Sequence, residues 1–333
     1  MTAPRVALVG ARRVRQGLGP FVARDLVAAG ARVTGVVGTS AESAAAAGRE
    51  LQSALGIEVR ACTDVRDLLA REALDALVIL SPSFSHETYL RAALDAGLHV
   101  LCEKPLVWGG EGLARRSETL AAGFERRGLL LRENCQWPHV LPAYGELHGL
   151  PDGPPRRFGM RLAPDSHGLE MLGDALSHPL SVLQALVPGP EPRCERPRFR
   201  ASTGSGGAQR IELEFVYRTG PCAVEVEVEL EQTHELPRPA ALAVDGRWAE
   251  RRVSMPGYTL HLTSGVRAVK VRDPLTVLIE DFVAQLRALR GGGTAAAPRE
   301  IVERMRLLES LVLAYASGTE RDEPRVPREG NEP

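Results

Sequence analysis

The sequence predicts a doubly wound α/β domain with a parallel sheet, followed by an α+β domain with a large, mostly antiparallel open sheet. Short apolar runs alternate with helical patterns through residues 1–135. Residues 223–231 alternate strictly between apolar side chains and glutamate, and two long helical patterns follow at 274–289 and 298–316. Near-continuous apolar strands between helices need cover on both faces, which is typical of parallel sheets, whereas an alternating strand has one face toward water.

The first 135 residues contain six strand-like runs. Ser40 and Asp64 are placed to cap helices, and Gly97 is placed to end one. The expected strands are 6–9, 32–37, 59–62, 76–80, 99–103 and one that begins at 129–131, and the expected helices are 20–29, 41–55, 65–71 and 86–96.

Residues 136–318 are expected to form the second domain. Between 223 and 231 only an element of period two sends all four glutamates to one side. The charged, proline-containing residues 319–333 are expected to be a disordered tail. The remaining expected elements are a helix over 169–186 that Pro179 can kink, strands at 211–217, 241–244 and 258–263, and the two final helices, separated by Gly291–Gly293.

The composition excludes several classes of protein. There are 41 basic and 42 acidic residues, so no global field attracts nucleic acid or anionic lipid. An apolar strand is predicted directly after residue 4, so we expect no signal peptide, and no apolar run approaches the roughly 20 residues of a membrane span. The five cysteines lack CxxC spacing and predict reduced thiols, without a disulfide framework or metal site. We therefore expect a cytoplasmic protein.

Glycines follow the first strand and precede the first helix. Gly10, Gly17 and Gly19 let the backbone turn tightly and approach a pyrophosphate, which then lies at the amide groups of the helix N-terminus. A longer stretch, 10–17, replaces the usual G-x-G-x-x-G spacing. Within an alternating domain, this pattern indicates a dinucleotide-binding Rossmann domain over 1–135.

The end of the second strand favours NADP over NAD. No carboxylate is available for a ribose 2′-hydroxyl until Glu42, and Arg15 is one of three arginines on the neighbouring turn that could pair with a 2′-phosphate. Alternatively, these arginines are only solvated, and NAD remains possible. The cofactor-binding residues expected here are Gly10, Arg12, Arg13, Gly17, Gly19, Gly38, Thr39 and Ser40.

Two polar turns follow the fourth and fifth strands, at 81–86 and 103–105. In an open parallel sheet both lie at the carboxyl edge, where ligands bind. The run Ala-Gly-Leu-His-Val-Leu-Cys-Glu-Lys-Pro at 96–105, with 80–86 and 171–178, resembles the Gfo/Idh/MocA (glucose–fructose oxidoreductase / inositol dehydrogenase) family.

The resemblance implies roles at the chemical end of the cofactor. Lys104 would lie beside the nicotinamide ribose and the reacting carbon, where its charge stabilises developing alkoxide. Ser81, Pro82 and His86 would line the nicotinamide-ribose side, next to Glu103. For His86 the alternative is an ordinary backbone hydrogen bond at a helix start.

Asp174 and His178 stand at i and i+4, which on one helix places both on the same face. Matched to the family, Asp174 would hold a substrate hydroxyl or the imidazole, and His178 would be the general acid/base. The alternative is a pair that only stabilises its helix. Leu176 and Ser181 replace a glycine and an aspartate frequent in the family, which suggests a less polar or differently shaped substrate.

Further pocket candidates follow the sixth strand and precede the 169–186 helix: Gln136, Trp137 and His167, of which Trp137 could simply be core. The expected activity is NAD(P)-dependent hydride transfer to or from a small sugar-, cyclitol- or natural-product-like hydroxyl or carbonyl compound, without a metal. Imine reduction, a non-redox reaction with transient oxidation, and a non-catalytic dinucleotide sensor remain alternatives. The family implies a homodimer or homotetramer through the C-terminal sheet, although four glutamates argue against an apolar interface there unless basic residues oppose them.

Overall fold

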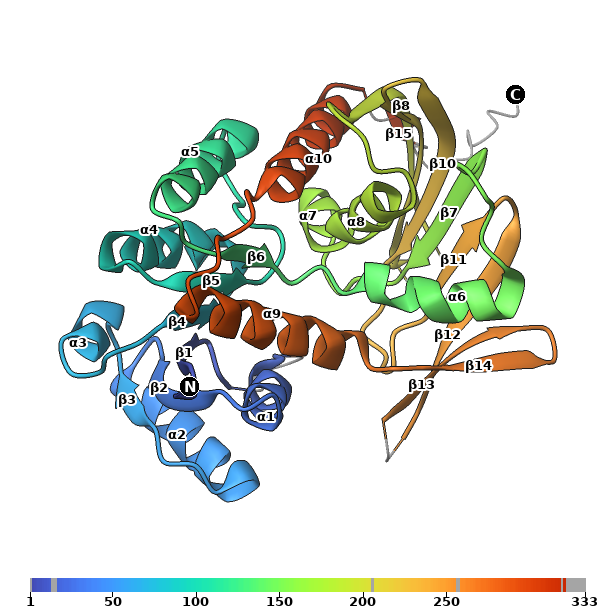
Figure 1. Ribbon diagram of the computed structural model, residues 1–333. Helices are drawn as coiled ribbons and strands as arrows, with labels where there is room; N and C mark the ends of the chain where they lie inside the picture. Colours follow the sequence, from blue (N-terminus) through green and yellow to red (C-terminus); the bar gives the residue numbers. More distant parts are fainter. Residues whose placement is uncertain (1, 13–16, 205–206, 256–257, 319, 322–333) are drawn as a thin grey trace, which may run out of the picture.

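The computed structural model describes residues 2–12, 17–204, 207–255, 258–318 and 320–321. Figure 1 shows two sheets joined side by side: a parallel sheet with helices on both faces, and a broad twisted sheet with helices on one face. This confirms the expected fold class. None of the described helices combines the length and the apolar character that crossing a bilayer requires.

Sheet A has the strand order β3-β2-β1-β4-β5-β6, and all its pairs are parallel. The order reverses between β1 and β4, and this switch point is where open α/β sheets bind ligands. Every residue of β4 is fully buried, as expected for a central strand. The strands are β1 Arg5–Val9, β2 Arg32–Val37, β3 Arg60–Cys62, β4 Ala76–Ile79, β5 His99–Cys102 and β6 Leu131–Glu133.

Three helix ends in the parallel-sheet half lie where the sequence predicted them. Ser40 and Asp64 cap their helices through side-chain oxygens, and Gly97 ends a helix with φ 73°. One helix was not expected, α5 Leu113–Arg126, which buries Leu120 and Phe124. The others are α1 Gly19–Ala28, α2 Ala41–Leu55, α3 Val65–Leu69, the short η1 Ser83–Ser85 and α4 His86–Ala96.

Sheet B has the order β14-β13-β12-β11-β7-β10-β9-β8-β15 and is mostly antiparallel. The β10–β7 pair is parallel, as is the short β15–β8 pair, which forms at the start of the expected tail. Residues 319 and 322–333 of that tail lie outside the described residues. The strands are β7 Arg157–Leu162, β8 Arg193–Thr203, β9 Gln209–Thr219, β10 Cys222–Glu231, β11 Ala240–Val244, β12 Arg247–Ser254, β13 Thr259–Ser264, β14 Arg267–Val271 and β15 Glu320–Arg321.

The alternating strand β10 separates its side chains as expected. Its valines and Leu230 are at most 2% exposed, and its glutamates lie on the opposite face. Arginines from neighbouring strands pair with these glutamates, Arg157 with Glu225 at 3.0 Å and Arg210 with Glu229 at 3.1 Å. The outer face of sheet B is therefore a ladder of ion pairs formed within one chain.

The single helix expected over 169–186 is wrong. Two helices, α7 Leu169–Ala175 and α8 Ser177–Leu186, meet at Leu176. Pro179 has no N–H to donate to the carbonyl of Ala175, and the carbonyl of Asp174 accepts instead from Lys104 Nζ. The remaining helices are η2 Trp137–Val140, α6 Leu141–His148, α9 Pro274–Arg290 and α10 Arg299–Gly318.

The chain crosses three times between the two sheets, first in the connection after β6. Helix α9 lies against α1, with Leu278 and Phe282 buried in the same apolar cluster as Val6 and Leu8 of β1. Helix α10 then returns to lie beside α5 and the inner side of β8. The two halves are thus joined by packed helices as well as by the connection after β6. These links hold the carboxyl edge of the parallel sheet opposite α7 and α8.

Candidate active site

The turn after β1 brings the backbone close to the end of β4. Gly10 has φ 77°, and a Cβ placed there would lie 2.8 Å from the backbone nitrogen of Ser81. A Cβ at Gly19, the first residue of α1, would lie 1.8 Å from the carbonyl oxygen of Ala11. Only glycine fits at either position, so the loop returns tightly onto the N-terminus of α1, as a pyrophosphate cradle requires. Gly17 lies in this turn, whereas Arg13 and Arg15 lie outside the described residues.

The end of β2 packs closely on the start of α2. A Cβ on Gly38 would lie 2.6 Å from the backbone nitrogen of Ala44. The Ser40 hydroxyl accepts from the N–H of Ser43 at 3.1 Å, so it is used as the helix cap, while Thr39 is exposed. Arg12 forms an exposed ion pair with Glu50 of α2, with Nε and Oε1 3.3 Å apart.

His86 is buried between the turns after β4 and β5. Its side chain belongs to a residue only 1% exposed, and its nitrogens lie 2.9 Å from the carbonyl oxygen of Pro105 and 2.8 Å from that of Ser81. Burial lowers the pKa of the imidazole, against the effect of these carbonyls. A neutral imidazole has one N–H, so it donates to one of these two carbonyls, which agrees with the alternative of a backbone hydrogen bond at a helix start. That His86 lines the nicotinamide ribose stays a prediction. Ser81 and the exposed Pro82 remain at the sheet edge.

Lys104 reaches from the end of β5 to the junction of α7 and α8. Its ammonium donates to the carbonyl of Asp174 and, at 2.8 Å, to Oδ1 of the same residue, and its side chain is 12% exposed. Burial alone would lower the pKa of Lys104, but the carboxylates of Asp174 and Glu103 raise it overall. Lys104 is therefore held as a fixed positive charge.

Asp174 binds Lys104 rather than an imidazole. Burial raises its pKa, but the Lys104 ammonium outweighs this and lowers it overall, so the carboxylate stays ionised. Its second oxygen lies 3.5 Å from the Ser166 hydroxyl and 3.9 Å from Arg238 Nη1. With its side chain 37% exposed, this oxygen is open to a substrate hydroxyl.

His178 lies on the next helix, yet faces the same cluster. Its ring centroid is 6.3 Å from that of Trp137, and its Nδ1 is buried without a hydrogen-bond partner among the described residues. Burial, followed by the charges of Lys104 and Arg251, lowers the pKa of His178 well below its ordinary value. The imidazole is thus neutral near pH 7, with a polar atom free for a ligand.

Leu176 and Ser181, the two departures from the family pattern, are both buried around this junction. The Ser181 hydroxyl donates to the carbonyl of His178 at 2.8 Å. Ser181 therefore supports the backbone of the histidine and does not present a carboxylate to a substrate.

Glu103 is engaged by its neighbour. Its carboxylate accepts from the side-chain amide of Asn134, and burial raises its pKa. Behind it, Glu133 accepts from the N–H of Leu106 at 2.8 Å and pairs with Arg304 of α10 at 2.7 Å. The sequence analysis did not identify this buried pair, although an arginine within the apolar face of α10 is a signal that could have been noticed.

The remaining pocket candidates have different surroundings. Trp137 is 6% exposed and belongs to the core, but its ring also lies against His178. Gln136 is half-buried at the start of η2, and His167 is exposed, next to Ser166.

Two arginines that sequence analysis missed, Arg238 and Arg251, lie beside Asp174 and Trp137. Arg251 of β12 lies over the Trp137 ring at 5.6 Å, and its Nη2 donates to the carbonyl of Arg238 at 2.7 Å. Tyr258, between β12 and β13, stacks on Phe21 of α1 at a centroid distance of 6.4 Å, so this hairpin touches the helix that starts at the glycine turn. No local pattern identifies these arginines, because their place depends on the pairing of distant strands.

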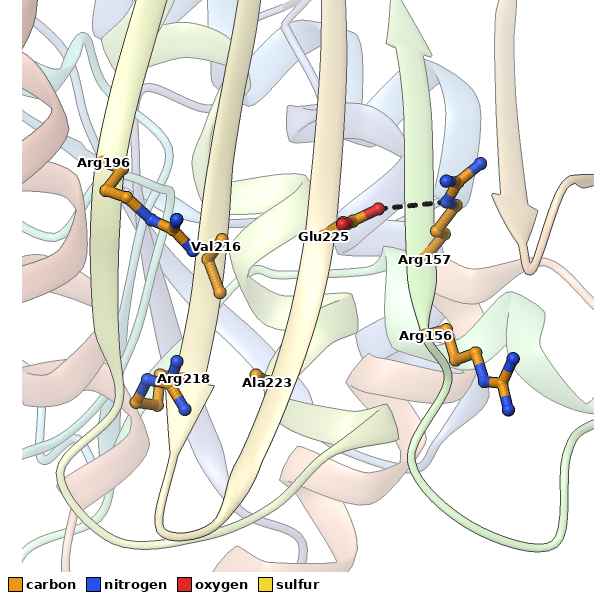
Figure 2. Close-up of a pocket in the computed structure, with 7 residues that line it drawn as sticks. All are labelled: Arg156, Arg157, Arg196, Val216, Arg218, Ala223 and Glu225. Atoms are coloured by element: carbon orange, nitrogen blue, oxygen red, sulfur yellow. Dashed lines mark hydrogen bonds and ion pairs between the residues drawn. The ribbon is translucent and has the colours of Figure 1, made fainter.

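A depression lies on the outer face of sheet B, away from the Lys104 site (Figure 2). It is an open hollow of about 390 Å³, and Arg157 and Glu225 pair across it. It lies among the ion-paired strands, on the face away from α7 and α8. It is lined by Arg156, Arg157, Arg196, Val216, Arg218, Ala223 and Glu225.

The sequence matches a known family over the parallel-sheet half. Residues 4–131 match the oxidoreductase family with an NAD-binding Rossmann fold, Gfo/Idh/MocA. An inositol 2-dehydrogenase from Leifsonia xyli is 27% identical over 291 residues, which cover 80% of this chain and 82% of that protein. An inositol 2-dehydrogenase from Corynebacterium glutamicum is 36% identical, but over only 29% of this chain and 30% of that protein.

Solved structures share the fold over nearly the whole chain. A UDP-N-acetylglucosamine 3-dehydrogenase from Acidithiobacillus ferrooxidans superposes with a TM-score of 0.68 at 23% identity, covering 94% of this chain and 98% of that one. A 3-ketoreductase from Actinomadura kijaniata in complex with TDP-benzene and NADP gives a TM-score of 0.65 at 21% identity, covering 96% and 99%. The parallel-sheet half of the chain is thus similar to the NAD-binding Rossmann domain of the Gfo/Idh/MocA oxidoreductases, and the whole chain shares the fold of these solved structures.

Proposed function

We propose that this protein is an NAD(P)-dependent dehydrogenase or reductase that transfers a hydride between nicotinamide C4 and a small hydroxyl or carbonyl substrate. The observation that carries the proposal is the meeting of Lys104, from the edge of the parallel sheet, with Asp174 and His178 of α7 and α8. A fixed cation, an ionised carboxylate and a neutral imidazole are the groups that such a reaction needs around one carbon–oxygen bond.

The residues present fit a dinucleotide. The glycine turn after β1 leaves no room for side chains and faces the N-terminus of α1, which suits a pyrophosphate. When bound, the dinucleotide supplies or accepts the hydride. The residues that would hold it, in addition to Gly10, Gly17 and Gly19, are Gly38, Thr39 and Arg12 at the adenosine end and Ser81, Pro82, Glu103 and Lys104 at the nicotinamide end.

Each catalytic residue has a distinct task. Lys104 polarises the substrate oxygen and stabilises the charge that develops on it. Asp174 holds Lys104 in place and accepts a hydrogen bond from a substrate hydroxyl through its second oxygen. His178 takes the hydroxyl proton in the oxidation direction and returns it in the reduction direction, and its lowered pKa keeps it in the basic form in the resting site.

We propose NADP as the preferred cofactor, with NAD as the alternative. The end of β2 offers Gly38, Thr39 and Ser40, so no carboxylate there repels a 2′-phosphate. Arg12, on the turn after the neighbouring strand β1, pairs with Glu50 of α2 in an exposed and exchangeable ion pair, which leaves it available to a 2′-phosphate. The 3-ketoreductase of the same fold has NADP bound.

The substrate class follows from the site and from the relatives. The similar proteins include an inositol 2-dehydrogenase, a UDP-N-acetylglucosamine 3-dehydrogenase and a 3-ketoreductase. We propose a sugar- or cyclitol-like substrate in which one hydroxyl or carbonyl is reached by both Lys104 and His178.

The test is a titration of the protein with NADPH and with NADH, followed by nicotinamide fluorescence. Binding tighter than about 1 mM is expected, with NADPH the tighter of the two. A screen of ketoses, cyclitols, imines and aldehydes then reports turnover through nicotinamide absorbance. Absence of binding for both cofactors would remove the proposed function, and tighter binding of NADH would reverse the cofactor assignment.

We further propose a cytoplasmic homodimer or homotetramer assembled through the outer face of sheet B. Its arginines and glutamates alternate, so two copies can exchange ion pairs across the interface. The five cysteines are free thiols, which suits a reducing compartment. Light scattering at micromolar concentration that shows a monomer would contradict the assembly.

A further inference from the structure

Two arginines, Arg251 on the inner face of sheet B and Arg238 in the segment before β11, lack hydrogen-bond partners among the described residues for part of their guanidinium groups. Arg251 shares the inner face of β12 with the fully buried Ala249, because strand residues two apart point the same way. The Nε atoms of Arg251 and Arg238 are both buried without a hydrogen-bond partner among the described residues. A buried guanidinium donor without an acceptor costs free energy, so it is expected where a ligand supplies the acceptor.

The carboxylates near these two arginines already have cationic partners. Asp174 is held by Lys104 at 2.8 Å, and Arg238 lies 3.5 Å from Asp165 and 3.9 Å from Asp174. Arg251 has no ion pair with a carboxylate of the described residues, and burial, followed by the neighbouring charge of Arg238, lowers its pKa. The cations Lys104, Arg238 and Arg251 thus lie near the carboxylates Asp165, Asp174 and Glu103, and Arg251 is the one cation of this cluster without an ion pair to a described carboxylate.

These arginines are within reach of the reacting atoms. The guanidinium of Arg251 lies 5.6 Å from the centre of the Trp137 ring, and the His178 ring lies 6.3 Å from the same centre. The charge of Arg251 also acts on His178, where it opposes protonation. One small molecule can therefore touch both groups.

We propose that the substrate carries an anionic group, a carboxylate or a phosphate, which Arg251 and Arg238 bind while Lys104 and His178 act on a hydroxyl or carbonyl elsewhere in the same molecule. This inference rests on the proposed function and narrows its substrate class. The acceptor oxygens of such a group satisfy the free guanidinium donors, and its charge supplies the counter-charge that Arg251 lacks. A bound anion beside Arg251 also favours protonation of His178, which prepares the imidazole as an acid for carbonyl reduction.

The experiment uses the full chain saturated with NADP⁺, so that phosphate cannot occupy the cofactor site. Inorganic phosphate is titrated at constant ionic strength by calorimetry, into the wild type, Arg251→Gln and Arg238→Gln. We expect saturable binding that each variant weakens by about tenfold or more, the range for a hydrogen bond to a charged group. The matched control is Arg252→Gln, one residue along β12 on the outer face, where Arg252 pairs with Glu250 at 2.5 Å. This control is expected to leave phosphate binding unchanged.

Three further titrations identify the anion. Glucose 6-phosphate and glucuronate are compared with glucose. If Arg251→Gln weakens the binding of glucose 6-phosphate most, the recognised group is a phosphate, and if it weakens the binding of glucuronate most, the recognised group is a carboxylate. Arg251→Lys, which keeps the charge, is expected to retain binding between wild type and Arg251→Gln, and it replaces the glutamine variant if that does not fold. The inference is overturned if none of phosphate, glucose 6-phosphate and glucuronate binds more weakly to the Arg251 and Arg238 variants than to the wild type. NADP⁺ binding, followed separately by fluorescence quenching, shows whether the proposed function itself has failed.

Discussion

Removing the charge of Glu133 is expected to destabilise the protein strongly, because Glu133 forms a fully buried ion pair. Its Oε2 lies 2.7 Å from Arg304 Nε, and the two side chains are 0% and 6% exposed. Its other oxygen accepts from the N–H of Leu106, two residues after Lys104. In Glu133→Gln the amide oxygen can still accept one of these hydrogen bonds, but the Arg304 guanidinium keeps only Gln184 as a neutral partner.

The size of the loss follows from this geometry. Leaving one member of a buried pair without its counter-charge costs about 3–5 kcal/mol of unfolding free energy. Arg306, two residues further along α10, provides a matched comparison, since it pairs with Glu118 at the same 2.7 Å but with both side chains about half exposed, 51% and 54%. Glu118→Gln is therefore expected to cost less than about 1 kcal/mol.

Guanidinium denaturation followed by tryptophan fluorescence and circular dichroism measures both variants. A double variant that also carries Arg304→Gln should be less destabilised than the sum of the single variants, because no unpaired charge remains. Equal losses for Glu133→Gln and Glu118→Gln would refute the reasoning that burial, not distance, determines the strength of these pairs.

Three shorter predictions concern glycine packing and pH. Gly38→Ala places a Cβ 2.6 Å from the nitrogen of Ala44 and should weaken NADPH binding about tenfold by shifting the end of β2; unchanged fluorescence titrations would argue against a cofactor at this edge. Gly173→Ala places a Cβ 2.5 Å from the Trp108 indole and should lower the unfolding free energy by about 1–3 kcal/mol, measured by denaturation. Burial lowers the pKa of His178, so below about pH 6.5 the unfolded chain binds a proton at this residue that the folded chain does not. The unfolding free energy therefore falls as pH falls, by up to about 1.4 kcal/mol per pH unit. His178→Gln should remove this contribution to the pH dependence, and an unchanged slope of unfolding free energy against pH would contradict it.

Local signals predicted most of the parallel-sheet half. The apolar runs of β1 and β4 and the caps at Ser40, Asp64 and Gly97 depend on neighbours in sequence, and the structure confirms them. The alternation of β10 likewise needs no tertiary information, because strand geometry alone separates its two faces.

The features that sequence analysis missed depend on contacts between distant segments. The break at Leu176 lies three residues before Pro179 and beside the Asp174 carbonyl, which accepts from Lys104, a residue distant in sequence. His86 follows a strand at the binding edge, and its ring lies against two backbone carbonyls. Arg251 gains its place only when β12 joins the sheet beside η2, which no sequence period reveals.

The most direct test of the central claim, that Lys104 and His178 act on one substrate at the nicotinamide, compares turnover with cofactor affinity. Lys104→Met and His178→Gln should each lower NAD(P)H-dependent turnover at least about 100-fold while NADPH binds within a few-fold of wild type. Lys270→Met, at an exposed lysine of β14, is the control and should retain full turnover. Turnover near the wild-type rate in both Lys104→Met and His178→Gln would contradict the account.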